Sequence, residues 1–134
     1  MERALGIGGI FFRATDPIAL AGWYRERLGI EAYATDHDAV WWPESGPTVF
    51  APFAVDTDYF GRPDQAWMLN VRVADLDRML DQLRAASVEV VGDVQTLAGI
   101  GRFAWVVDPE GNRIELWEPA PEALVRPSAG PGDE

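Results

Sequence analysis

Histidine and cysteine, which often carry nucleophilic, acid-base or metal chemistry, are scarce in this 134-residue chain. There is no cysteine, which excludes disulfides, thiolate nucleophiles and zinc-cysteine sites. The one histidine, His37, stands between Asp36 and Asp38, and this string could suggest a metal site. Adjacent residues on a strand point to opposite faces, and the string falls in a polar turn. We therefore expect a solvated turn there.

Charge and composition exclude several classes of protein. Acidic residues outnumber basic ones by 22 to 11, and the formal net charge is −11. Nucleic-acid binding needs clustered positive charge, so no nucleic-acid partner is expected. The N-terminal segment has no basic stretch or cleavage pattern, and no apolar run approaches the ~20 residues of a membrane span. These features predict one cytoplasmic domain over residues 1–134 with no membrane partner.

The chain repeats one order of elements twice. Residues 5–54 read as strand, helix and three strands, with strands expected at 5–12, 30–34, 39–42 and 48–53 and the helix at 18–28. Residues 66–119 repeat that order, with strands expected at 67–73, 88–91, 103–107 and 113–118 and a helix after Asp75. Thr15 or Asp16 is expected to cap the first helix and Asp75 the second; Asp75 is offset from Asp16 by 59 positions (75 − 16), as expected for duplicated units.

The pattern thus predicts an α+β fold of two tandem βαβββ modules. Residues 55–65 form the linker between the modules, and its Tyr59 and Phe60 suggest that the linker packs against another part of the chain. Residues 120–134 are rich in proline, glycine and alanine, which predicts a loosely ordered tail.

Two motifs are similar to those of a known group of proteins. The first is Trp23-Tyr24-Arg25-Glu26-Arg27-Leu28-Gly29-Ile30, at the end of the first helix. The second runs from Gly101-Arg102-Phe103 through Asp108-Pro109-Glu110-Gly111-Asn112-Arg113-Ile114-Glu115-Leu116-Trp117. Together they resemble the vicinal oxygen chelate superfamily, which includes glyoxalase I, bleomycin-resistance proteins and extradiol dioxygenases. The resemblance covers residues 5–119. It implies paired modules whose sheets curl around a shared cavity, often in a homodimer.

The resemblance also implies where a metal would be bound. Enzymes of this superfamily place metal ligands on the first and last strands of each module, which here correspond to Gly9, Phe50, Met68 and Glu115. Only Glu115 offers an oxygen donor, whereas a divalent metal needs several carboxylate or histidine ligands. We therefore expect a member with a degenerate metal site, no metal and no cofactor, and neither glyoxalase I nor dioxygenase activity.

Strand alternation extends these positions to one face of the cavity. The candidate ligand-binding residues are Phe11, Phe50, Met68, Asn70, Arg72, Arg113, Glu115 and Trp117. The intervening residues Trp67, Leu69, Val71, Ile114 and Leu116 should face the helices. Glu115 is the one catalytic candidate, either as a carboxylate paired with Arg113 or Arg72, which we favour, or as a general base in apolar surroundings. Trp41 and Trp42 point oppositely, and the sequence does not say which lines the cavity.

These features favour a metal-independent binding protein of the bleomycin-resistance type over a catalyst. Its ligand would be a hydrophobic or aromatic molecule, such as an antibiotic or a metabolite, held in an aromatic-lined cavity. One alternative is a metal-independent lyase or isomerase that uses Glu115. Another is an interaction module in which a homodimer is itself the function.

Overall fold

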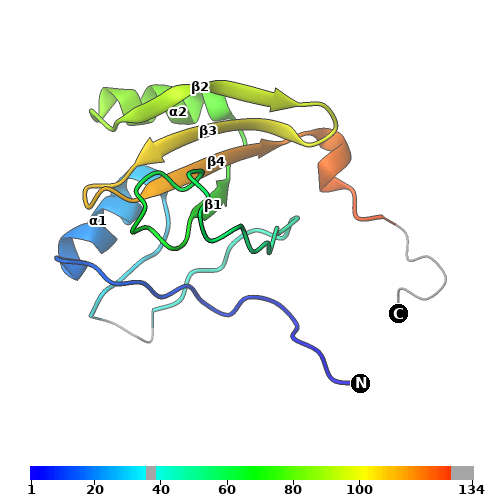
Figure 1. Ribbon diagram of the computed structural model, residues 1–134, viewed down its shortest axis with the longest axis horizontal. Helices are drawn as coiled ribbons and strands as arrows, with labels where there is room; N and C mark the ends of the chain where they lie inside the picture. Colours follow the sequence, from blue (N-terminus) through cyan, green and yellow to red (C-terminus); the bar gives the residue numbers. More distant parts are fainter. Residues whose placement is uncertain (36–38, 128–134) are drawn as a thin grey trace.

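The computed structural model describes residues 1–35 and 39–127 of the chain (Figure 1). The turn predicted at His37, with Asp36 and Asp38, and the end of the predicted tail from residue 128 lie outside the described residues.

A four-stranded mixed sheet is formed by the second half of the chain. Its strands are β1 (Leu69–Arg72), β2 (Val90–Leu97), β3 (Gly101–Val107) and β4 (Arg113–Pro119). They lie in the order β1-β4-β3-β2, with β1 parallel to β4 and the other neighbours antiparallel (Figure 1). With the helix between β1 and β2, these elements make one βαβββ unit, so the α+β class predicted from the sequence is confirmed.

Both predicted helices form, and both begin at the predicted capping residues. In α1 (Pro17–Leu28) and α2 (Leu76–Ala85), the side chains of Asp16 and Asp75 accept a hydrogen bond from a backbone N–H three residues on, at 3.1 and 3.0 Å. Gly29 ends α1 in the left-handed conformation, with φ of 70°. Among the residues that the structure describes, no helix is long and apolar enough to cross a membrane.

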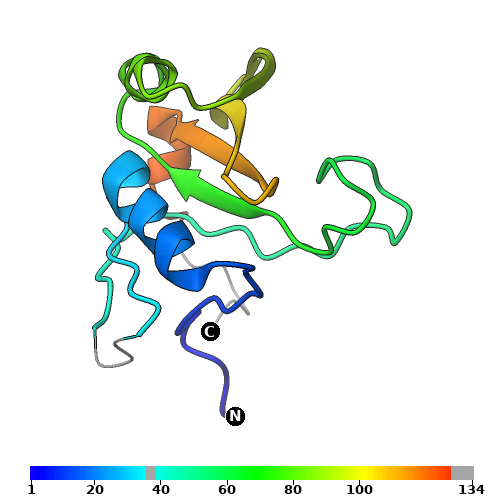
Figure 2. The same cartoon turned by 90° about the vertical axis from the view of Figure 1, so that its left-hand side faces the viewer.

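The two helices cover one face of the sheet (Figure 2). The buried apolar side chains of this layer are Leu20, Tyr24, Leu28, Leu76, Leu80, Leu83, Ala104, Val106, Ile114 and Leu116. Alternation along β4 therefore turns Glu115 and Trp117 to the other face of the sheet, as the sequence predicted. After β4, a 3-10 helix, η1 (Pro121–Leu124), begins the C-terminal segment.

The first half of the chain contributes a helix but no strand among its described residues. The segments predicted as strands at 5–12, 30–34, 39–42 and 48–53 have irregular backbone (Figure 1). A helix closes its hydrogen bonds within one segment, whereas a strand needs a paired neighbour. Phe11 and Phe50 are accordingly 94% and 87% exposed. These four strand predictions for the first half are therefore wrong for a single copy of the chain.

Candidate functional site

Three side chains form a row across the sheet, on the face away from the helices. The register pairs Glu115 of β4 with Asn70 of β1 on one side and with Trp105 of β3 on the other. Paired residues project from the same face of a sheet, so the three side chains are neighbours. This register brings together a carboxylate, a carboxamide and an indole.

The Glu115 carboxylate accepts hydrogen bonds from three neutral groups. Asn70 Nδ2 donates to Oε1 at 2.6 Å, Trp105 Nε1 donates to Oε2 at 3.0 Å, and the Tyr59 hydroxyl also donates to Oε2. Glu115 is 8% exposed. Among the described residues Glu115 forms no ion pair, so the prediction that it pairs with Arg113 or Arg72 is wrong. We call Tyr59, Asn70, Trp105 and Glu115 the Glu115 cluster.

Tyr59 reaches the cluster from the linker, residues 55–65, which projects on the side of the sheet opposite the helices (Figure 2). Its ring stacks on Phe53, with centroids 5.5 Å apart, and meets Trp105 edge to face at 6.1 Å. Phe60 lies 5.1 Å from Phe53. Burial, then the hydrogen bond to Glu115, raises the pKa of Tyr59 to about 12. At neutral pH the phenol is therefore a hydrogen-bond donor.

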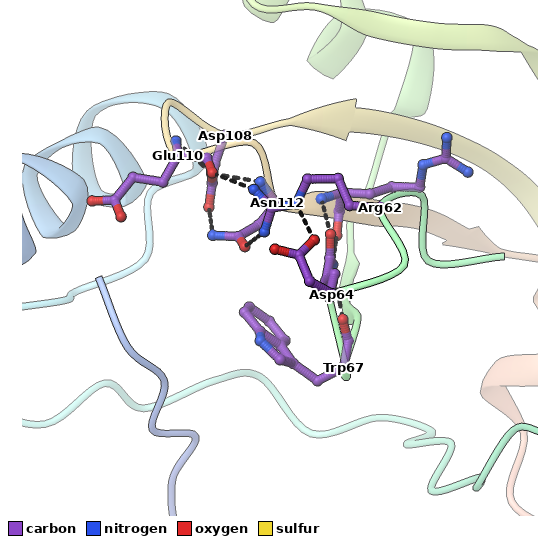
Figure 3. A network of polar contacts seen from close by, with 8 residues as sticks. Arg62, Asp64, Trp67, Asp108, Glu110 and Asn112 are labelled. Carbon is purple, nitrogen blue, oxygen red and sulfur yellow. Dashed lines mark hydrogen bonds and ion pairs between the residues drawn. The ribbon is translucent and has the colours of Figure 1, made fainter. Parts of the chain in front are cut away.

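The end of the linker is fixed to the start of β4. Gln65 is buried; its Nε2 donates to the carbonyls of Trp67 and Arg113 at 2.8 and 3.0 Å, and its Oε1 accepts from the Arg113 N–H at 2.8 Å. Arg62 donates to the carbonyl of Glu110 and to Oδ1 of Asn112, at 2.8 and 3.3 Å (Figure 3). These bonds tie the linker that carries Tyr59 to the sheet.

The turn before β4 joins the two sequence motifs in space. Asp108 is buried, accepts two backbone N–H bonds and the Asn112 side-chain amide (Figure 3), and also accepts the Tyr24 hydroxyl at 2.7 Å. Burial and the contact with Asp108 raise the pKa of Tyr24 above its ordinary value. Glu110 accepts the N–H groups of Asp16 and Thr15, which lowers the pKa of its carboxyl. The turn thus positions both α1 and β4.

Three other predicted site residues share the sheet face of the cluster, and each donates a hydrogen bond to a backbone carbonyl. Arg113 donates to the Tyr59 carbonyl at 3.3 Å, and Arg72 donates to the Glu44 carbonyl at 2.8 Å. Trp117 is 5% exposed; its indole donates to the Ile100 carbonyl at 3.0 Å, and its ring stacks on Phe103.

Other predicted residues are not part of the cluster. Met68 is half-buried on the chain just before β1. Phe11, Phe50 and Trp42 are largely exposed, and Trp41 is 43% exposed, so the structure selects neither tryptophan as a cavity residue. Trp105 and Tyr59 were absent from the predicted site. The aromatic pair in the linker was the available signal for Tyr59, whereas Trp105 needed the register of β3.

The residues at the metal positions do not fit a metal centre. Gly9 and Phe50 have no donor atom, and Met68 offers only a thioether. The oxygens of Glu115 are already engaged by three donors. Within residues 1–35 and 39–127, no three histidine, cysteine, aspartate or glutamate side chains gather where they could hold a metal ion.

Two open hollows lie elsewhere on the surface. One of about 710 Å³ lies beside α1 and the turn at Glu110, with Trp23 in its wall. The other, of about 340 Å³, lies between the two helices and β1. In the first hollow, the backbone N–H groups of Thr15 and Asp16 are already taken by Glu110. The Glu115 cluster is therefore the better candidate site, because it combines a buried charge with an aromatic wall.

The described elements thus form one α+β unit in which the helix motif and the turn motif are in contact. The family model of the glyoxalase-like domain matches residues 9–117, and the chain belongs to that family. This confirms the resemblance to the vicinal oxygen chelate superfamily. A solved member of the glyoxalase/bleomycin resistance protein/dioxygenase superfamily from Sphaerobacter thermophilus is 18% identical, with a TM-score of 0.50, over 78% of this chain and 90% of that one. That likeness concerns the fold alone.

Two weaker similarities carry no argument about function. The antibiotic-binding protein TnmS3 from a Streptomyces species is 23% identical over 75% of this chain and 84% of that one, with a TM-score of 0.44. An arginine–tRNA ligase from Roseobacter denitrificans is 27% identical over 97 residues, which covers 57% of this chain. The chain spans 17% of the length of that curated relative.

Proposed function

We propose that this protein binds a hydrophobic or aromatic small molecule, such as an antibiotic or a metabolite, on the sheet face that carries Glu115. In this proposal it needs no metal or other cofactor and releases the ligand unchanged, in the cytoplasm. The observation that carries the proposal is the Glu115 cluster: one buried carboxylate held by neutral donors beside the rings of Phe53, Tyr59 and Trp105. Apolar walls with a few fixed polar groups are usual in small-molecule sites.

The hydrogen bonds of the cluster favour binding over catalysis. General acid-base chemistry needs a group that is free to take or give a proton at the operating pH. The Tyr59 phenol, with a pKa of about 12, stays protonated at neutral pH. Asn70 and Trp105, the other donors to Glu115, do not titrate, so the cluster offers Glu115 no acid-base partner at neutral pH. A lyase or isomerase that uses Glu115 is therefore the second candidate.

We further propose that the first module completes the site in a homodimer. Large apolar side chains are exposed along the segments predicted as strands: Leu5, Ile7, Ile10, Phe11, Tyr33, Val40, Trp41, Trp42, Val49, Phe50 and Phe53. Exposed apolar surface of this extent is usual at interaction sites. Pairing of these segments with a second copy would form the tandem modules, curl the sheets around a cavity and bring Phe11 and Phe50 toward the ligand. The same surface supports the alternative of a dimeric interaction module.

Tryptophan fluorescence and mass spectrometry test the proposal together. The protein is titrated with aromatic metabolites and antibiotics while its intrinsic tryptophan fluorescence is recorded. The mass of the recovered ligand is then measured by mass spectrometry. We expect saturable binding with unchanged ligand mass, and weaker binding by the Glu115→Gln variant. The matched control is Asp58→Asn, which removes the same charge from an exposed side chain of the linker.

A recovered product of altered mass would contradict the binding function and support the lyase or isomerase alternative. Binding that is identical in the wild type and in Glu115→Gln would contradict the placement of the site.

A further inference from the structure

We infer that the ligand carries a positive charge, an amine or ammonium group on an aromatic or apolar body, and that this cationic end lies at Glu115. The inference rests on the proposed function and names the chemical class of the ligand.

The first observation is that Glu115 has no direct ion-pair partner among the described residues. The side chain is 8% exposed, and its three hydrogen-bond donors, from Tyr59, Asn70 and Trp105, are all neutral. Among the described residues no ion pair includes this carboxylate. A buried charge without an opposite charge is unfavourable. A cation supplied by the ligand would compensate it.

The second observation is a free acceptor position on the carboxylate. An ionised carboxylate has about four lone-pair positions. Oε2 receives two donors, from Tyr59 and Trp105, whereas Oε1 receives only the amide of Asn70. Asn70, the donor to Oε1, is an exposed residue on β1, the edge strand of the sheet. The N–H of a protonated amine could bind there without displacing any of the three donors.

The third observation is the arrangement of the other charges and rings on this face. Arg113 and Arg72 share this face and keep their charges; their guanidinium groups donate to the backbone carbonyls of Tyr59 and Glu44 and form no ion pair with Glu115. The edge-to-face pair of Tyr59 and Trp105 borders the carboxylate, and aromatic faces attract cations. The net charge of −11 also attracts cations toward the protein.

Three probes of similar size and different charge test the inference. Isothermal titration calorimetry measures Kd for 2-phenylethylamine, a cation, for 2-phenylethanol, which is neutral, and for 3-phenylpropionate, an anion. A charge-assisted hydrogen bond at a largely buried site should favour the cation over the neutral probe by about tenfold. Equal affinities, or tighter binding of the anion to the arginines, would overturn the inference and leave the proposed function standing. No binding of any probe would count against both.

Variants locate the charge preference. Glu115→Gln should make the Kd values of the amine and the alcohol similar. Asp58→Asn, which has the same net charge as Glu115→Gln, should keep the wild-type ranking. If circular dichroism shows that Glu115→Gln is unfolded, the ranking of the three probes by the wild type and by Asp58→Asn decides. A ranking that Asp58→Asn abolishes would show that general surface charge is responsible, and the inference would fail.

Discussion

A buried carboxylate is often neutralised by an arginine, but Glu115 is instead held by a phenol, an indole and a carboxamide. Hydrogen bonds to a charged group contribute about 1.5–3 kcal/mol each in proteins, and three such bonds leave the carboxylate little freedom to rotate. At the scale of single residues, the site is therefore an acceptor in a fixed orientation, flanked by rings. Such a group is suited to orienting a ligand.

The raised pKa of Tyr59 gives a prediction on pH. Since the pKa in the folded protein is about 12 and the ordinary value is 10.0, the protonated phenol is favoured by folding. This stabilisation is fully present below pH 10 and is lost as the pH rises through 12. We expect the unfolding free energy of the wild type to fall more steeply over this range than that of Tyr59→Phe. Urea denaturation measures both, and parallel curves would contradict the raised pKa of Tyr59.

The elements of the fold are joined by the turn between β3 and β4. The buried hydrogen bond from Tyr24 to Asp108 connects α1 with this turn, over 84 residues of sequence. Removing one partner leaves a buried acceptor with fewer donors, which costs about 1–3 kcal/mol. Tyr24→Phe should therefore lower the unfolding free energy by that amount.

Tyr33→Phe is the control for this change, because Tyr33 is 49% exposed and its hydroxyl makes no hydrogen bond in the described part of the chain. Thermal and chemical denaturation of both variants give the comparison. Equal stabilities of the two variants would mean that the turn and α1 are not coupled through this bond.

The helices could be predicted from sequence because their signals are local. Asp16 and Asp75 cap them, and Gly29 ends the first. The strands depend on partners far away in sequence, and β2 illustrates the limit. It was predicted at 88–91 but extends over Val90–Leu97, because Gly92, with φ of 69°, is accommodated in an irregular stretch of pairing with β3. In isolation, Gly92 and Asp93 read as a turn.

The site could be predicted in part, because the alternation of side chains along a strand is also a local signal. Alternation along β1 and β4 placed Asn70 and Glu115 on one face, and the register confirms that they are neighbours. The partners of Glu115 were mispredicted, because Arg113 and Arg72, the charged residues of the predicted cavity face, were favoured. Tyr59 lies 56 residues from Glu115, and no local pattern connects the two.

At the scale of the whole molecule, a single copy of the chain does not explain why so many apolar side chains of the irregular first-half segments are exposed. Burying a phenylalanine or tryptophan contributes roughly 1.5–3 kcal/mol relative to leaving it exposed. If the exposed segments pair with a second copy, the wild type should be a dimer in light scattering coupled to gel filtration. Phe11→Asp with Phe50→Asp should shift it toward the monomer, whereas Leu124→Asp, an exposed apolar residue in η1, should not. A wild-type monomer at all concentrations would contradict this assembly.

The most direct test of the central claim asks which indole a bound ligand touches. Trp105 donates its indole N–H to Glu115, whereas Trp23 lines the 710 Å³ hollow beside α1. In nitrogen-proton correlation spectra, with the two peaks assigned by Trp105→Phe and Trp23→Phe, titration with the tightest ligand of the panel should shift the Trp105 peak and leave the Trp23 peak in place. A ligand that shifts Trp23 and leaves Trp105 unchanged would contradict the placement of the site at Glu115.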